Sequence, residues 1–449
     1  MKRKILSLIG MGIIALGFPF LSKAAQIKVD EDTFADLQAQ IRVFYINADK
    51  GGYPFTPFHE TSPYRDYRQN HVHVYKYRLG AKGQISKLIS FYGNFDSNDN
   101  EGYQTMLWEA AIYFNFRPEF IIGGGKIRVP FSRHVFVGRH NSPVMSSDGD
   151  YFLASQFREA LKAVDPYLGG YRGRQPYKRT DMGMMIKGSI KDGLLKYFVG
   201  IFSEDRFNAT RVWENGFKAA QTIGPQRDKK NFEYDIRLEF TPTFWGFKQE
   251  PNVFDPSSRV YQTYGGAFDT MTFGIGYHHE THLENANATK YGASSLTRKA
   301  YAADFSFEKK FYEKYIIGAE LGYMYFKDSH FYQTLTGNYK KGDVWTWYGE
   351  AHLIYDEKIL GLGFPGIGFR YEYVNVDGTS GDKKDLVYER YGACLSYYPI
   401  RKKNRIDVTN RIGIGFDYVK ARDALKAYIK SNNWDDSNLT WYVGVYMQF

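Results

Sequence analysis

Apolar and polar residues alternate one by one through long stretches of this sequence, and this pattern limits the folds that the chain can adopt. In Phe232–Phe240 every second residue is apolar or aromatic, and the residues between them are Glu, Asp, Arg and Glu. The chain ends in the same way, because Trp441–Phe449 places Trp, Val, Val, Met and Phe on one face. Successive side chains of a β-strand point to opposite faces, so each stretch predicts a strand with one apolar side and one more polar side.

The N-terminus has the pattern of a secretory signal peptide. Three basic residues precede the apolar stretch Ile5–Leu21, and Ser22-Lys23-Ala24 supplies small residues at the positions that a signal peptidase reads. We expect residues 1–24 to be a signal peptide, with a retained anchor helix as the alternative, and residues 25–449 to form one barrel domain. Without the signal, 55 basic residues oppose 49 acidic ones, so net charge indicates little about partners. We expect no nucleic acid among them.

The fold of this exported chain cannot be stabilised by internal disulfides. Cys394 is its one cysteine, so no internal disulfide can form. After the signal, no apolar run is long enough for a membrane-spanning helix, while aromatic residues make up 18% of the chain. A soluble β-sandwich also alternates, but it does not explain strands of such length and even spacing. The combination predicts an all-β transmembrane barrel in the outer membrane of a Gram-negative-type bacterium, with lipid outside and water within.

Turn signals divide the mature chain into sixteen antiparallel strands. We expect them at residues 37–47, 71–83, 85–96, 104–116, 119–129, 179–191, 194–203, 231–241, 260–280, 297–309, 312–327, 343–357, 360–376, 385–399, 404–420 and 437–449. Short links such as 192–193 alternate with long polar ones such as 204–230, as in barrels with short periplasmic turns and long outer loops. Residues 241–259 are too many for a simple turn. Sixteen strands leave an aqueous lumen.

The apolar face of the last strand is expected to contact lipid. Open strand edges are not tolerated in hydrocarbon, so the last strand must pair with the first and turn its apolar face to lipid. We expect Trp441 and Phe449 at the heights of the membrane interfaces. The ending also resembles the C-terminal signal that the outer-membrane barrel-assembly machinery reads, with Met447 in place of the usual aromatic residue.

Strand parity assigns charged side chains to the lumen and distributes them unevenly. The first six strands have only Glu109 and Asp181 as inward acids, and their inward basic residues are Arg42, Lys76, Arg78, Lys82, Lys126, Arg128, Arg179 and Lys187. The later strands are balanced or acidic, with inward residues such as Arg370, Arg390, Arg411, Glu350, Glu372 and Asp417. One wall is therefore predicted to be basic and to guide small inorganic anions. A solvated lattice of salt bridges without selectivity is the alternative.

The longest connection, residues 130–178, is the candidate to fold inward and narrow the pore. Loops of this length in compact structures are usually functional or disordered. Arg133 and Arg139 lie near its start, and we include both in the expected anion pathway because guanidinium groups suit oxyanions. An extracellular lid without a role in gating is the alternative.

Two stretches within about residues 72–240 carry a family resemblance. Gly125–Ser132 reads Gly-Lys-Ile-Arg-Val-Pro-Phe-Ser, and Asp181-Met182-Gly183 is followed by Asp192–Ser203. The first stretch is similar to the Gly-x-x-Lys-x-Pro-Phe-Ser ending of a strand in the phosphate-selective porin O and P family, with Arg128 at the position of the family's lysine. The second is similar to that family's next hairpin. The resemblance implies a homotrimer of sixteen-stranded barrels that passes anions, with phosphate or polyphosphate among the candidates.

The remaining motifs favour a channel without catalysis, cofactor or metal. Gly123-Gly124-Gly125-Lys126 lacks the spacing and the Ser or Thr of a phosphate-binding loop. His279-Glu280-Thr281-His282 has one residue too few for a zinc-protease helix; opportunistic metal binding with His278 and a polar loop are the alternatives. No local signature indicates the nucleophile and base of a barrel enzyme.

A sugar-specific channel is a second functional alternative, because it needs a row of inward aromatic residues. Tyr348 shares the inward parity of Glu350 and is a candidate for such a row. Trp345 and Trp347 have the opposite parity and are expected in the outer aromatic girdle.

Overall fold

The structure, a computed structural model, describes residues 25–48, 70–98, 105–138, 141–145, 180–203, 232–282, 296–333, 339–359, 361–380, 383–431 and 436–448. The predicted signal peptide and the terminal Phe449 lie outside these residues. Within the described part of the chain, no helix has the length and apolar character that crossing a membrane requires.

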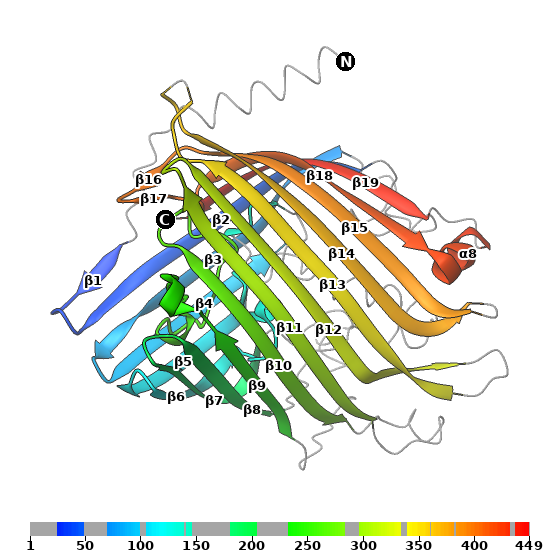
Figure 1. Cartoon of the computed structure of the whole chain (residues 1–449), viewed down its shortest axis with the longest axis horizontal. Coiled ribbons are helices and arrows are strands. Elements are labelled where there is room, and N and C mark those ends of the chain that lie inside the picture. Colours follow the sequence, from blue (N-terminus) through cyan, green and yellow to red (C-terminus); the bar gives the residue numbers. More distant parts are fainter. Residues whose placement is uncertain are drawn as a thin grey trace.

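Sixteen of the described strands form a closed ring, as predicted (Figure 1). All neighbours in the ring pair antiparallel, and it closes where the last strand, β19, pairs with β2. In order, the strands are β2 (Phe34–Ala48), β3 (Asn70–Ser86), β4 (Ile89–Asn98), β5 (Met106–Arg117), β6 (Phe120–Arg128), β7 (Thr180–Ile190), β8 (Leu195–Ser203), β9 (Phe232–Phe240), β10 (Thr270–His282), β11 (Leu296–Phe311), β12 (Tyr315–Gln333), β13 (Tyr339–Tyr355), β14 (Phe364–Ser380), β15 (Lys383–Tyr398), β18 (Arg411–Arg422) and β19 (Ser437–Gln448). A further short strand, β1 (Gln26–Lys28), pairs with residues 34–36 of β2.

The connections divide between the two ends of the barrel. The hairpin of β16 (Arg401–Lys402) and β17 (Arg405–Ile406) lies beside the C-terminus, and α8 (Asp423–Ser431) lies at the opposite end (Figure 1). The barrel end that carries this hairpin also carries the tight turns, at residues 87–88, 118–119, 191–194 and 312–314. This asymmetry agrees with the prediction except at two places.

The two exceptions concern single connections. β14 and β15 are separated by residues 381–382 alone, although they meet at the end of the long loops. β9 and β10 are joined at the turn end by residues 241–269. The strand predicted over residues 260–280 therefore begins only at Thr270, and the strand predicted over 404–420 begins at Arg411. Alternating sequence before Thr270 does not extend the ring, because those residues pack inside it.

The outer face of the barrel is apolar and the inner face is charged. Along β9, Phe232 and Ile236 are 50% and 42% exposed, while Asp235 and Arg237 are fully buried. On β19, Trp441 is 49% exposed and Tyr446 points inward, as predicted. This distribution is the inverse of a soluble protein's, in which charged side chains face water. A closed barrel with an apolar exterior is the architecture of outer-membrane proteins, so the chain belongs in the outer membrane.

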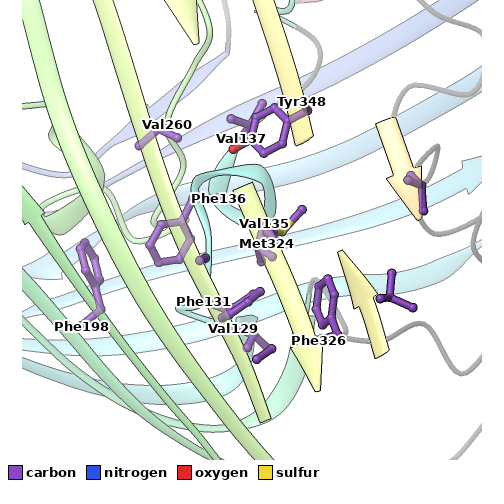
Figure 2. Packing of buried hydrophobic residues seen from close by; sticks show 14 of the residues in the cluster. Val129, Phe131, Val135, Phe136, Val137, Phe198, Val260, Met324, Phe326 and Tyr348 are labelled. Carbon is purple, nitrogen blue, oxygen red and sulfur yellow. The ribbon is translucent and has the colours of Figure 1, made fainter. Parts of the chain in front are cut away.

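Part of the barrel interior is packed like a hydrophobic core. The residues after β6 form α2 (Arg133–Phe136), and the β9–β10 connection contains η4 (Thr243–Trp245) and η5 (Pro251–Val253). Phe136 and Val137 lie beside Val260 inside the ring (Figure 2). Val137 and Val260 form a parallel bridge, in which the Val260 N–H donates to the Phe136 carbonyl at 3.1 Å. Two connections that enter from opposite ends of the barrel therefore meet within it.

Candidate functional site

The candidate functional site is the barrel lumen, which is lined by inward side chains and by two inserted stretches of chain. The first stretch, which we term the loop segment, comprises residues 130–138 and 141–145 of the predicted inward loop. The second is the β9–β10 connection, residues 241–269. The rest of the predicted loop, including Arg139, lies outside the described residues.

Arg133 fastens the loop segment to two other parts of the lumen. Its Nη1 and Nη2 atoms donate to the carboxylate of Glu250 at 2.6 and 2.8 Å, and its Nε donates to Glu320 at 3.0 Å. The backbone N–H of Arg133 donates to Asp304 at 3.0 Å. Arg133 was predicted to serve passing anions. These acids compensate its charge, so Arg133 offers a passing anion less than an arginine without an acidic partner does.

The loop segment continues to the far wall of the barrel. Ser142 donates to Glu350 at 2.9 Å, and Met145 joins a buried cluster with residues of β2, β15 and β19. Gly413 leaves the space that Met145 occupies, since a Cβ there would lie 2.4 Å from the Met145 sulfur. The segment therefore contacts both sides of the lumen.

The β9–β10 connection is held by basic residues of the predicted wall. The Lys187 ammonium donates to the Asp255 carbonyl at 3.0 Å and to the Ser258 hydroxyl at 2.9 Å. Lys82 forms an ion pair with the Asp255 carboxylate at 3.1 Å, and Arg259 forms one with Glu109. Sequence reasoning missed this insertion, and the one available signal was the excessive length of residues 241–259 for a turn.

Acids within the predicted basic wall neutralise much of its charge. Lys76 and Arg78 both form ion pairs with Asp96, at 2.7 and 2.8 Å. Asp96 was not among the predicted inward acids, yet it is only 1% exposed. Arg128 forms an ion pair with Glu109 at 2.7 Å. These side chains face inward as predicted, but they form a lattice of salt bridges over this part of the wall.

Another predicted residue does not face the lumen. Lys126 pairs across the sheet with Met182, which is 46% exposed on the outer face, and its ammonium donates to the Leu107 carbonyl at 2.7 Å. Its predicted inward position is wrong because the odd-numbered residues of β6 face inward: Ile121 pairs with the buried Lys187 and Ile127 with the buried Asp181, without a register shift between them. Arg179 lies outside the described residues.

Arg42 and Arg411 lie on either side of the Tyr446 ring, and we term them the Arg42–Arg411 pair. Both pair with Tyr446 across neighbouring strands, and their guanidinium carbons lie 4.9 and 4.6 Å from its ring centroid. Both are buried, at 3% and 1% exposure. Arg42 Nη1 and Arg411 Nε and Nη2 have no hydrogen-bond partner, and within the described residues neither guanidinium has a carboxylate partner.

The histidines and aromatic residues singled out in the sequence separate by face. His278 points inward and is 2.9 Å from Asp235, whereas His279 lies beside Tyr234 of the outer face; the His282 side chain is not described. Tyr348 faces inward, but it packs against His134 with ring centroids 5.3 Å apart.

Trp345 and Trp347 lie on the outer face, as their parity predicts, so neither can line a path for sugars. Trp347 is 51% exposed on the outer face, and Trp345 stacks on Tyr373, with ring centroids 5.0 Å apart. Tyr348 is packed as well, so none of the three aromatic residues weighed in the sequence supports a sugar channel.

Solved structures similar to this barrel are outer-membrane proteins. Pseudomonas putida OprB matches with a TM-score of 0.52 and 11% identity, over 92% of this chain and 94% of that chain. OmpF of Salmonella typhi, in complex with daunomycin, matches at 0.47 and 13% over 95% and 100% of the two chains. An anion-selective porin from Comamonas acidovorans matches at 0.46 and 10%, over 92% and 99%.

The likeness to OprB establishes the fold, and the chain has a porin-type outer-membrane barrel. At these identities the likeness extends to the fold alone. No protein-family model and no curated protein matches the sequence. Membership of the phosphate-selective porin O and P family therefore stays a prediction.

Proposed function

We propose that this protein is a passive channel for small anions across the outer membrane. The porin-type barrel supports a channel, and the Arg42–Arg411 pair supports the preference for anions. Three of the N–H-bearing atoms of this pair lack a partner in a buried environment. Buried donors without partners are costly, so such groups favour an acceptor that enters from solution.

The Arg42–Arg411 pair carries the proposal because most other predicted cations are already compensated. Lys76, Arg78, Lys82, Arg128 and Arg133 each have a carboxylate within 3.1 Å. A salt bridge between fixed residues leaves little net field for a passing ion. Two arginines that share one aromatic ring instead of acids retain their full positive charge, and guanidinium groups bind oxyanions in a two-pronged geometry.

Reversal potentials in a planar bilayer under a salt gradient test this proposal. We expect an anion-selective potential for the natural protein and a shift toward cation selectivity in the double variant Arg42→Gln and Arg411→Gln. A unit charge at 4 Å in water contributes about 1 kcal/mol, so the permeability ratio should fall by up to roughly fivefold.

Matched charge removal outside the lumen provides the control. Lys87→Gln and Lys314→Gln remove two positive charges from side chains that are 83% and 50% exposed at the turns, and we expect them to leave the potential unchanged. A cation-selective natural protein, or an equal shift in both double variants, contradicts the proposed anion path.

The finer parts of the proposal concern phosphate and the loop. We include phosphate or polyphosphate among the solutes because of the resemblance at Gly125–Ser132, and we propose that residues 130–178 narrow the lumen. The contacts of the loop segment with Glu250, Glu320 and Glu350 support the narrowing. Block of single-channel current by phosphate, compared with sulfate and chloride, tests the solute preference.

Assembly and processing complete the proposal. We propose a signal peptide over residues 1–24, recognition of the C-terminal strand by the barrel-assembly machinery, lipid around the apolar exterior, and a homotrimer. Recognition of the C-terminal strand is supported by the alternation on β19, in which Trp441, Val443 and Val445 share the outer face. We propose no catalytic activity. The mass of the detergent-extracted complex tests the trimer.

A further inference from the structure

Two neighbouring strands place a histidine and three carboxylates in one buried cluster on the lumen wall. Glu233 and Asp235 come from β9, and His278 and Glu280 come from β10. Their exposed fractions are 1%, 0%, 1% and 5%. Period-2 alternation brings Glu233 and Asp235 to the same face, and His278 is the cross-strand partner of Asp235. The cluster is therefore a consequence of the register between β9 and β10.

The donor atoms of this cluster lie close enough together to converge on one metal ion. His278 Nδ1 lies 2.9 Å from Asp235 Oδ1 and 3.8 Å from Glu233 Oε1. Donor atoms of Glu233, Asp235 and His278 all lie within 4.8 Å of one another. Bonds of about 2.0–2.2 Å to a zinc ion place neighbouring ligand atoms roughly 3–3.5 Å apart. Small side-chain adjustments suffice to surround an ion.

Unsatisfied buried atoms point to a ligand at this place. Asp235 Oδ2 and His278 Nε2 have no hydrogen-bond partner, although both side chains are nine-tenths buried or more. Native proteins satisfy nearly all buried polar atoms, so two such atoms in one cluster require an explanation. A cation between the imidazole Nδ1 and the two carboxylates would give Asp235 Oδ2 a partner, and it would leave His278 Nε2 to the neighbouring Glu280.

Glu280 supplies the outer partner that metal-bound histidines usually have. Its Oε2 lies 3.7 Å from His278 Nε2, on the opposite side of the ring from Asp235. An imidazole that binds metal through one nitrogen normally donates its other N–H to a carboxylate, which fixes the ring and its tautomer. The cluster thus contains both the ligands and the orienting group.

The loop segment lies directly against this cluster. The rings of Phe131 and His278 are 5.9 Å apart at 62°, and a Cβ on Gly276 would lie 1.7 Å from the Phe131 carbonyl oxygen. Glycine at this position lets the loop segment approach β10, and the approach buries the cluster. A bound ion would therefore be shielded from the solution in the lumen.

We infer that Glu233, Asp235 and His278 bind one divalent metal ion of the zinc class, with Glu280 orienting the imidazole. Mixed imidazole and carboxylate ligands suit zinc and similar first-row ions. Two carboxylates neutralise the charge of the ion, and the neutral imidazole is the third ligand. This inference does not depend on anion selectivity, because the cluster lies on strands other than those of the Arg42–Arg411 pair.

Zinc titration of the full-length barrel in detergent, after treatment with EDTA, tests the site by calorimetry. We expect one Zn²⁺ per chain. His278→Ala and the isosteric Asp235→Asn should each weaken the affinity by at least about tenfold. His279→Ala is the matched control, because this neighbouring histidine lies on the outer face, and it should leave the affinity unchanged. Circular dichroism confirms the strand content of each variant.

Three results overturn the inference. They are an absence of Zn²⁺ binding by the natural protein, an unchanged affinity in Asp235→Asn, and a loss of affinity in His279→Ala equal to that in His278→Ala. An absence of binding would identify the cluster as a buried ion pair between His278 and Asp235.

Discussion

Asp255 is a single carboxylate that ties the β9–β10 connection to the barrel wall. Burial opposes its ionisation, but the Lys82 ammonium and hydrogen bonds from Ser257 outweigh burial and hold the pKa of Asp255 below its ordinary value of 3.8. A carboxyl whose pKa is lower in the folded state stabilises that state at pH values above the unfolded pKa. This contribution disappears as the pH falls through the lowered folded pKa.

The pH dependence of unfolding should therefore separate the natural protein from Asp255→Asn. In urea titrations we expect the natural protein to be the more stable of the two above pH 3.8, and the difference to vanish in stronger acid. When Lys82→Met is present in both proteins, the stability difference between Asp255 and Asp255→Asn should be much smaller, because the charge that pairs with Asp255 is gone. Parallel stability curves for the natural protein and Asp255→Asn at every pH would show that the ion pair contributes nothing.

Residue positions were predictable from parity, but their partners were not. Alternation correctly predicted that Arg42, Lys76 and Arg78 face inward. It could not tell that Asp96 neutralises two of them, or that Arg133 binds Glu250, which lies 117 residues away along the chain. Face assignment depends on period alone, whereas partner choice depends on how distant segments pack. Lys126 shows that even the face can be misassigned, because apolar residues of β6 such as Ile121 and Ile127 also face the lumen.

At the scale of elements, the strands were predictable and the inserted connections were not. Strand length, parity and turn signals predicted the sixteen strands and the closure of β19 on β2. From the sequence alone, the apolar residues near Val260 are equally compatible with a strand and with a packed connection. Their burial against Phe136 and Val137 depends on a segment that enters from the other end of the barrel (Figure 2).

A disulfide between the two inserted stretches tests this meeting. Val137 and Val260 form a parallel bridge, and neighbouring strands lie about 4.8 Å apart, within the Cα separation that disulfides tolerate. In the variant Val137→Cys and Val260→Cys, we expect oxidation to join the two positions, as detected by mass spectrometry of peptides. Cys394 is buried elsewhere and should stay reduced.

A control pair uses a position on the exterior. Val29 is 77% exposed on the N-terminal stretch, so Val137→Cys with Val29→Cys should not cross-link within one chain. If the Val137 and Val260 pair fails to cross-link in a folded barrel, the two stretches do not meet as described.

At the scale of the whole molecule, three features act together: a closed ring, an apolar exterior and a charged interior. The ring satisfies every strand edge, so the exterior can contact lipid without exposed backbone groups. The interior combines the loop segment and the β9–β10 connection, which pack against several parts of the wall, with the uncompensated Arg42–Arg411 pair on β2 and β18. We propose that the packed segments support the barrel and that the Arg42–Arg411 pair serves ion passage.

The most direct test of this account is single-channel recording of the purified protein in a planar bilayer with different KCl concentrations on the two sides. We predict stable conductance steps whose reversal potential has the sign for chloride as the more permeant ion. An absence of conductance steps, or a reversal potential with the sign for potassium, would contradict the account.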